Sequence, residues 1–522
     1  MRTPSLTFRP WPVLFLAGVL GASVAAPAAT DTDAASLSAL QRQLAQVQAA
    51  LQQLSDENRA LRQHQQEVDR KLAELRATTA APAAAASQAA SAAPPAAQGV
   101  APASGAAVAA SATAQPNASA LPGAAALPPT ATTEPGTTGA GLFATGLRLW
   151  GYGEVYYTHP TSDPSQAQMD LARAVFGIGY RFDPRTEFNS EYEVEHAVSS
   201  ADDVGEFEVE QFYVDRQLND AAAVRAGLFL MPFGLLNEHH EPTNFYGVQR
   251  NFVETLIIPS TWREGGVNLH GDTSAGFGWN VGLTTGFDLS KWDFAPQFPP
   301  YTTALELGNS GIAPLQATHQ ELALANAHNL SQYAALSYYG VPGLLLGGAI
   351  STGEAVRFPL PSGASSGSAP RVTLWEAHAR WTPAKWDLSA LYAHGAISNV
   401  AAANAASPGS PNPIPSSFYG YLVQGAYSLW EQREYRLAPF VRFERYDMGA
   451  SYQGTAGPVI PTGLVPLSAN GDLGYWPENH DRVWTAGANF YLGPHVVVKG
   501  DYQWFEVNRG FNRFDLGLGV SF

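Results

Sequence analysis

Apolar and polar residues alternate along most of the chain from about residue 142 to its end. The segment RFDLGLGVSF shows the pattern best. Its apolar positions are Phe514, Leu516, Leu518, Val520 and Phe522, and the residues between them are small or polar. A strand with one apolar face and one small, polar face fits a barrel wall between lipid and water. The pattern predicts transmembrane β-strands, and the terminal aromatic residue is typical of outer-membrane barrels.

The same alternation predicts sixteen strands, an even number, as a closed antiparallel barrel requires. They are expected at about 147–158, 170–182, 185–197, 206–217, 222–232, 263–270, 277–287, 330–340, 343–353, 371–381, 386–397, 417–429, 435–448, 481–491, 496–507 and 513–522. Short and long connections alternate between them, and 233–262 and 288–329 are among the long ones. Short periplasmic turns and long external loops are the usual asymmetry of such barrels.

The expected fold is therefore all-β. It is a 16-stranded antiparallel transmembrane β-barrel over residues 142–522, preceded by an α-helical coiled coil and a disordered linker. The alternative is a soluble, secreted all-β protein in which the alternation forms sandwich cores. The length, the absence of disulfides, the terminal aromatic residue and the asymmetry of the connections favour the membrane barrel.

Residues 35–77 carry a heptad repeat whose a and d positions are mostly leucine and valine. This pattern predicts a coiled coil, and therefore an oligomer. Asn58 and Gln65 are the two polar residues of the seam, and we expect them to fix register and oligomer number. The seam alone leaves dimer and trimer open. The alternative is a single amphipathic helix on a globular surface.

The remaining N-terminal segments have simple compositions. Residues 78–141 are mostly Ala, Pro, Ser, Thr and Gly with a single charge, which predicts a disordered linker. Residues 1–25 have a basic start, an apolar stretch and small residues at the end, which predicts a signal peptide cut after Ala25 or Ala28. An uncleaved membrane anchor is the alternative. With an even strand number, both barrel ends face the periplasm, so the expected location is the Gram-negative cell outer membrane with the coiled coil in the periplasm.

Composition and motifs narrow the classes of function. The chain has no cysteine, which excludes disulfide frameworks and thiolate metal sites. Its net charge of −16 argues against nucleic acid as a partner. No nucleophile motif accompanies the acidic and histidine residues, so we expect no enzyme and no cofactor.

The connection 233–262 contains the sequence LLNEHHEPTNFYG and is unusually apolar for an exposed loop. Apolar loop residues need a packing surface, and the inner wall of a wide barrel provides one. We therefore expect this loop to fold inward and narrow the pore. The residues expected to line the constriction or to anchor the loop are Glu238, His239, His240, Glu241, Arg250, Glu254 and Arg263. Adjacent histidines diverge in a strand and the helical His-Glu-x-x-His spacing is absent, so no metal site is expected.

Several stretches resemble one known family. FNSEYEVEHA, GEFEVEQFYVDRQLND and RAGLFLMPFGLLNEHHEPTNFYGVQRNFVETLIIPSTWREGG, together with Phe522, are similar to the phosphate-selective porin O and P family. The resemblance covers roughly 147–522 and is strongest over 186–270. It implies a trimeric, sixteen-stranded outer-membrane channel. The preceding coiled coil is similar to that of some dicarboxylate-type relatives, which implies a homotrimer and favours three strands for the coil.

The residues expected to face the lumen depart from the family's phosphate-selective members, which have an arginine ladder and a lysine cluster. From residue 142 on, the lysines are Lys291, Lys385 and Lys499 alone. The residues expected to set lumen selectivity are the acidic Glu187, Glu191 and Glu193 and the basic Arg436, Arg442 and Lys499. Opposed acidic and basic rows would produce a transverse field that favours small polar solutes. Structural pairing of the acidic rows with Arg173, Arg216 and Arg225 is the alternative.

The expected function is that of an outer-membrane porin for passive diffusion of small hydrophilic solutes. Its water-filled pore would be narrowed by the inward loop 233–262. Phosphate binding is not expected, because the lysine cluster is not visible. The alternative function is a structural tether, in which the periplasmic coiled coil would link the outer membrane to the cell wall.

Overall fold

The computed structural model describes residues 146–197, 205–296, 311–360, 367–460, 465–466 and 475–522. The predicted signal peptide, coiled coil and linker, including Asn58 and Gln65, lie outside the described residues. In the part of the chain that is described, no helix is both long enough and apolar enough to cross a membrane.

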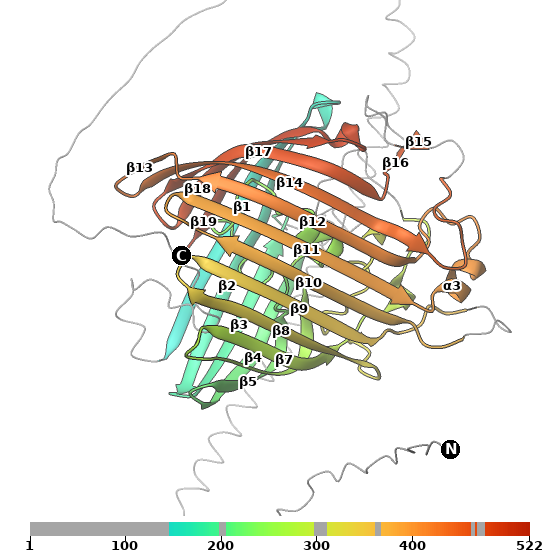
Figure 1. The fold of residues 1–522 in the computed structure, drawn as a ribbon, viewed down its shortest axis with the longest axis horizontal. Coiled ribbons are helices and arrows are strands. Elements are labelled where there is room, and N and C mark those ends of the chain that lie inside the picture. Colours follow the sequence, from blue (N-terminus) through green and yellow to red (C-terminus); the bar gives the residue numbers. More distant parts are fainter. Residues whose placement is uncertain (1–145, 198–204, 297–310, 361–366, 461–464, 467–474) are drawn as a thin grey trace, which may run out of the picture. The chain divides into compact units, whose positions relative to one another are not determined.

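Sixteen long strands form one closed, antiparallel β-barrel (Figure 1). They are β1 (Leu147–Pro160), β2 (Gln168–Asp183), β3 (Thr186–Glu195), β4 (Phe207–Asn219), β5 (Ala222–Leu230), β6 (Arg263–Asp272), β7 (Phe277–Thr285), β8 (Leu330–Val341), β9 (Leu344–Glu354), β10 (Arg371–Trp381), β11 (Trp386–Ser398), β12 (Pro415–Tyr427), β14 (Tyr435–Tyr452), β17 (His480–Leu492), β18 (Val496–Phe505) and β19 (Arg513–Ser521). Each predicted strand corresponds to one of these, and the ends differ by a few residues. The predicted fold class is therefore confirmed for the barrel.

The other elements are short. They are β13 (Trp430–Gln432), which extends the β12–β14 hairpin, the parallel pair β15 (Val465–Pro466) and β16 (Tyr475–Trp476), the six-residue helix α3 (Ala401–Ala406), and the helical turns η2 (Pro164–Gln166), η3 (Val253–Ile257), η4 (Leu289–Lys291) and η6 (Arg509–Phe511). The turns that join β2 to β3, β4 to β5 and β17 to β18 are short, whereas the connections at the opposite end are longer. The predicted asymmetry is therefore present.

Pairing of the first strand with the last closes the barrel. Tyr152 of β1 is the register partner of Ser521 in β19, and the pairing continues to Pro160 opposite Arg513. The backbone of Gly151 exchanges two hydrogen bonds with that of Phe522, at N···O distances of 3.0 and 2.8 Å. No edge strand remains in the ring, which satisfies the backbone groups without a partner molecule.

The outer surface of the wall is apolar. Leu516 and Leu518 are each 45% exposed, and the aromatic residues Trp381, Trp386 and Trp504 are also exposed. These side chains alternate along their strands with buried polar residues, as a wall between lipid and water requires. The face predicted to be apolar in the last strand is the outward one.

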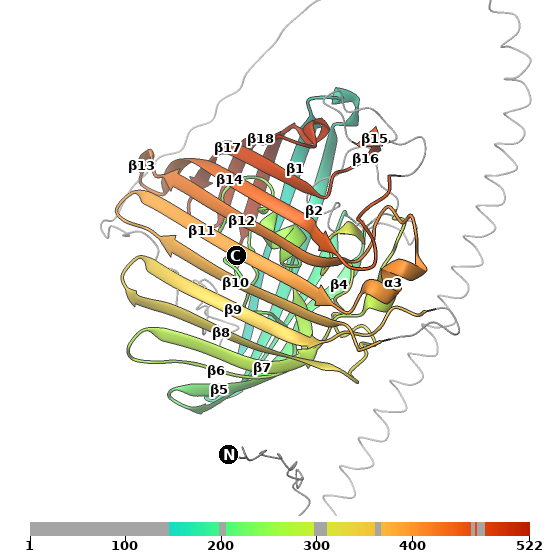
Figure 2. The same ribbon diagram turned by 45° about the vertical axis from the view of Figure 1, so that its right-hand side comes forward.

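The main hydrophobic core lies inside the barrel. The connection 231–262 turns inward, and its η3 residues pack against β11, β12 and β14. Val253, Leu256 and Ile257 are at most 1% exposed, and they belong to one cluster with Phe418 and Tyr446 of the wall. Figures 1 and 2 show part of this green connection between the near and far strands. Inward folding of this loop is confirmed.

A second connection, 286–329, also contributes to this inner core. Its described residues Ile312, Ala313 and Leu315 are at most 6% exposed and join the same cluster. The sequence analysis did not anticipate this. The described residues of the two inward connections thus share one apolar cluster with wall residues of β10, β11, β12 and β14.

We expect the Ile257→Ala substitution to lower the free energy of unfolding by about 2–4 kcal/mol, because it leaves a cavity in a fully packed site. Equilibrium urea unfolding in lipid vesicles measures the change. Leu516→Ala on the outer face is the control, since its side chain is half exposed on the outer wall rather than packed in the core. Equal losses in the two variants would contradict the inner-core description.

Candidate pore constriction

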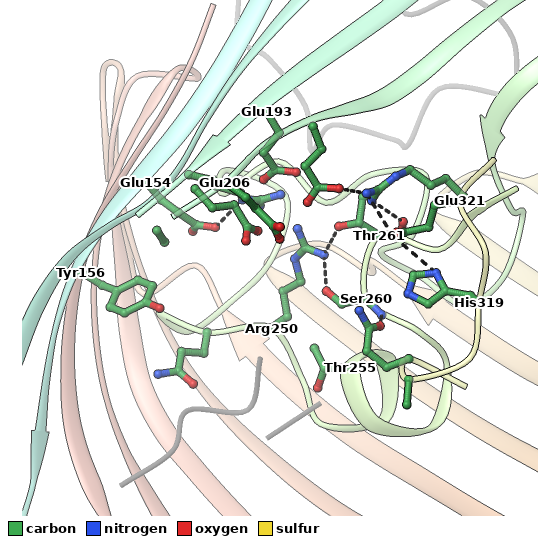
Figure 3. Close-up of a pocket in the computed structure, with 18 of the residues that line it drawn as sticks. Glu154, Tyr156, Glu193, Glu206, Arg250, Thr255, Ser260, Thr261, His319 and Glu321 are labelled. Atoms are coloured by element: carbon green, nitrogen blue, oxygen red, sulfur yellow. Dashed lines mark hydrogen bonds and ion pairs between the residues drawn. The ribbon is translucent and has the colours of Figure 1, made fainter. Parts of the chain in front are cut away.

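A cavity of about 410 Å³ lies between the wall and the two inward connections. Strands β1 to β4 contribute one side, and residues from 248–263 and 316–321 contribute the other. Figure 3 shows the acidic residues Glu154, Glu193 and Glu206 facing Arg250 and the loop hydroxyl groups across this space. The cavity lies inside the barrel, between β1 to β4 and the two inward connections.

The wall side of the cavity is strongly acidic. Glu154 comes from β1, Glu193 and Glu195 from β3, and Glu206 and Glu208 from the region of β4. Alternation along β3 places its two glutamates on the same inward face. Carboxylate oxygens of Glu193, Glu195 and Glu208 lie within 4.8 Å of one another. Such close carboxylates repel, so this wall attracts cations from the lumen.

Arg250 provides the positive charge on the loop side. Its Nη1 donates hydrogen bonds to Ser260 Oγ and Thr261 Oγ1, both at 2.8 Å. These two bonds hold the guanidinium at the cavity surface (Figure 3). Burial, and then the neighbouring cation Arg173, lower the pKa of Arg250 from its usual value. Arg250 was predicted for the constriction; the structure places it at the surface of this cavity, and its role in a constriction stays a prediction.

Arg263 links the wall to the second inward connection. Its guanidinium forms ion pairs with Glu208 of β4 and with Glu321, the latter at 3.0 Å. His319 Nδ1 lies 3.5 Å from the same Glu321 carboxylate. This chain of contacts spans two strands and a loop, so Arg263 fixes the position of residues 319–321 beside the pore.

The sequence analysis missed His319 and Glu321. The signal that could have found them is the order of residues in 312–321, where the apolar stretch IAPL precedes polar QATHQE. The predicted inward loop 233–262 has a similar mixture of apolar and polar residues. A long connection with an apolar segment is therefore a candidate for inward packing wherever it occurs.

His240 anchors the first inward loop to the wall. The side chain is 3% exposed, and its Nε2 lies 2.7 Å from the Tyr152 hydroxyl and 2.9 Å from Glu210 Oε1. Its backbone carbonyl accepts a hydrogen bond of 2.5 Å from Arg173. Burial, and then the charges of Arg250 and Arg173, lower the pKa of His240 well below its usual value. This environment holds the imidazole neutral.

The other residues predicted for the constriction lie away from the cavity surface. Glu254 is 3% exposed and accepts hydrogen bonds from the backbone of Leu235 and Leu236, at 2.6 and 2.7 Å. Its carboxylate therefore holds the turn of the loop. Glu241 accepts a 2.6 Å hydrogen bond from Asn244 within the loop. Glu238, His239 and Glu241 are half-buried and do not line the cavity.

The residues predicted to set lumen selectivity occupy three different environments. Glu193 lines the cavity, whereas Glu187 forms ion pairs of 2.6 Å with both Arg148 and Arg181. Glu191 accepts a 2.5 Å hydrogen bond from Trp150 Nε1. The acidic row on β3 is thus only partly paired, and its partners are not the arginines that the sequence analysis considered.

The predicted basic residues face the packed loop rather than the cavity. Arg442 Nη1 donates a 3.1 Å hydrogen bond to the carbonyl of Tyr246, and Lys499 Nζ lies 3.4 Å from the centre of the Phe245 ring. The Arg436 guanidinium lies over the Tyr491 ring. Arg442 and Lys499 therefore hold the loop, and none of the three basic residues lines the cavity.

Known proteins of similar sequence or structure add little beyond the barrel. No family model matches the sequence. A protein of Aquifex aeolicus (strain VF5), described only as uncharacterized, is 27% identical over 368 residues, which are 68% of this chain and 75% of that protein.

Three solved outer-membrane proteins are similar in structure at low identity. The OmpF of Salmonella typhi, in a complex with daunomycin, is 12% identical with a TM-score of 0.48, over 73% of this chain and 99% of that one. The outer membrane channel DcaP of Acinetobacter baumannii is 12% identical with a TM-score of 0.40, over 72% and 97%. OprB of Pseudomonas putida is 13% identical with a TM-score of 0.42, over 73% and 96%. The function must follow from this chain's own geometry.

We expect the buried His319 to lower the stability of the folded protein in acid. Burial lowers the pKa of His319 from 6.5 to about 4. The unfolded chain takes up a proton on His319 near pH 6.5, whereas the folded protein does so only near pH 4. The stability of the folded state that depends on a neutral His319 is therefore present above pH 6.5 and is lost as the pH falls towards 4. We expect a loss of roughly 3 kcal/mol over this range.

Urea unfolding in detergent between pH 7 and pH 4 tests this expectation. In the His319→Gln variant the loss should be smaller, because glutamine does not take up a proton. His480→Gln changes an exposed histidine and should behave as the wild type. Equal losses of unfolding free energy between pH 7 and pH 4 in the His319→Gln variant and in the wild type would contradict the role of His319.

Proposed function

We propose that this protein is an outer-membrane porin for small hydrophilic solutes and that its constriction favours cations. The observation that carries the proposal is a closed, sixteen-stranded barrel that holds an acidic cavity between its wall and its own inward connections. A barrel of this size leaves room for an aqueous channel. Its apolar exterior fits lipid, and the cavity is lined mostly by polar and charged side chains.

The charges beside the cavity support the preference for cations. Arg173 is paired with Glu154 at 2.8 Å, and Arg263 is paired with Glu208 and Glu321. The other carboxylates at the cavity are those of Glu193, Glu195 and Glu206, and among the described lining residues Arg250 faces them from the loop side.

The acidic wall opposite Arg250 also supports the transverse electric field predicted from the sequence, although other residues form its positive side. Arg250 takes the place expected for Arg436, Arg442 and Lys499. Water and dipolar solutes that cross such a field are oriented by it. Phosphate selectivity is not part of the proposal, because the cavity has few cations and most of them are paired with carboxylates.

We also propose a homotrimer in the outer membrane, tied by the coiled coil over 35–77. The support is the heptad repeat and the family resemblance.

Deletion of residues 31–141 distinguishes the porin from the tether alternative. A porin keeps its single-pore conductance after this deletion, whereas a tether loses its role in holding the membrane to the cell wall.

The Glu193→Gln substitution should reduce the preference for cations. One unit charge about 5 Å from a permeating ion contributes about 0.8 kcal/mol in water, which corresponds to about a fourfold change in local ion concentration. Reversal potentials in planar bilayers under a potassium chloride gradient measure the permeability ratio.

Two variants make this measurement decisive. Arg250→Ala should shift the ratio in the opposite direction, because it removes the positive side of the field. Glu431→Gln changes an exposed residue of β13 and should leave the ratio unchanged. Anion preference in the wild type, or block by low phosphate, would overturn the proposed selectivity. Absence of any conductance would overturn the porin itself.

A further inference from the structure

The cavity between the wall and the two inward connections is lined by buried polar groups that lack a partner among the described residues. Gln249 lines the cavity and is 8% exposed, yet neither Oε1 nor Nε2 of its side chain has a hydrogen-bond partner there. Arg173 lines the same cavity and is 3% exposed, and its Nη1 lacks a partner as well. Buried polar atoms are rarely left in this state, so their concentration at one cavity indicates a ligand.

The loop side of the cavity fits a negatively charged group. Arg250 follows Gln249 directly, and its Nη1 is held by the hydroxyl groups of Ser260 and Thr261, both at 2.8 Å. These acceptors are neutral, and in the part of the chain that the structure describes Arg250 forms no ion pair with a carboxylate. A guanidinium matches a carboxylate in charge and in the geometry of its N–H groups. The amide of Gln249 supplies a further donor on the same side of the cavity.

The wall side of the cavity fits a primary ammonium group. Carboxylate oxygens of Glu193, Glu195 and Glu208 lie within 4.8 Å of one another. A nitrogen centred between three oxygens with 4.8 Å spacing lies about 2.8 Å from each, the usual length of a hydrogen bond between an ammonium and a carboxylate. An ammonium has three N–H donors, one for each oxygen. Glu208 also pairs with Arg263, so the positive charge of the solute would chiefly offset that of Glu193 and Glu195.

A solute with a single charge fits only half of this cavity. A simple anion would meet the carboxylates of the wall, and a simple cation would leave Arg250 and Gln249 without a partner. A molecule that carries an ammonium and a carboxylate a few bonds apart meets both requirements. The volume of about 410 Å³ lies near the lower end of the range for small-molecule sites, roughly 300–1,000 Å³, so the solute is small.

We propose that this cavity binds an α-amino acid in its zwitterionic form. The ammonium lies at the carboxylates of Glu193 and Glu195, and the carboxylate lies at Arg250 and Gln249. Figure 3 shows Glu193 and Arg250 facing each other across the space that the solute would occupy. The proposal rests on the proposed porin function, because it names one class among the small hydrophilic solutes that the pore would admit.

Block of the ion current by L-alanine tests the site. The full chain is inserted into planar bilayers in potassium chloride at neutral pH, and the current is recorded as solute is added. Ethylammonium is alanine without its carboxylate, and propionate is alanine without its ammonium, so each control solute removes one charge. We expect alanine to reduce the current in a saturable way. Ethylammonium and propionate should each need at least about tenfold higher concentrations for half block, or about 1.4 kcal/mol less binding free energy.

Three variants assign the two ends of the solute. Gln249→Ala should raise the half-blocking concentration of alanine by about tenfold and leave the weak block by ethylammonium unchanged. This substitution removes no hydrogen bond among the described residues, so we expect the variant to fold. Glu193→Gln should weaken the block by alanine and by ethylammonium alike. Glu431→Gln changes an exposed residue of β13 and should behave as the wild type.

The outcomes separate the amino-acid site from the porin function. Conductance with no block by alanine, or with equal block by alanine and ethylammonium, would overturn the site and leave the porin intact. Unchanged block by alanine in Gln249→Ala would also overturn the site. Absence of conductance would overturn the porin, and the cavity is then tested by calorimetric titration of the full chain in detergent with L-alanine. Saturable binding that Gln249→Ala weakens would support the site, and no binding by the wild type would overturn it.

Discussion

Apolar packing inside the barrel is the constraint on which the rest of the structure depends. Ile257, Leu256 and Val253 of the inward loop belong to one buried cluster with Phe418 and Tyr446 of the wall. A barrel of this width would otherwise be filled with water throughout. The cavity beside this apolar contact is lined by β1 to β4 and by polar residues of the two inward connections.

The polar contacts determine how the packed loop is held. Backbone groups of the loop form hydrogen bonds with side chains of the wall. The N–H of Phe252 donates a 2.7 Å hydrogen bond to Glu444 Oε1, and Asn489 Nδ2 donates a 3.0 Å hydrogen bond to the carbonyl of Phe245. His240 adds a third attachment on the opposite wall through Tyr152. Attachments on both sides of the lumen fix the loop, so the charged groups at its edge keep a defined distance from the acidic strands.

The sequence was informative about strands because an outer-membrane wall imposes a period of two on every segment. The apolar character of 233–262 also predicted its inward course, since exposed phenylalanine, leucine and isoleucine require a surface to pack on. The charged residues were harder to assign. Glu254 and Arg250 are four residues apart in the same loop, yet one is buried under a turn and the other faces the cavity. Alternation does not continue through irregular backbone, and the second inward loop was missed because only part of it is apolar.

The seam between β1 and β19 has a consequence for assembly. The first strand of the barrel finds one of its two neighbours only in the final strand, and the two are separated by the whole length of the wall. Every other strand can pair with its immediate successor as the chain is delivered. Until β19 is available, one edge of β1 has no partner within the barrel, and unpaired edges are the sites at which sheets pair with other chains. Pairing of residues 513–521 with β1 removes this edge.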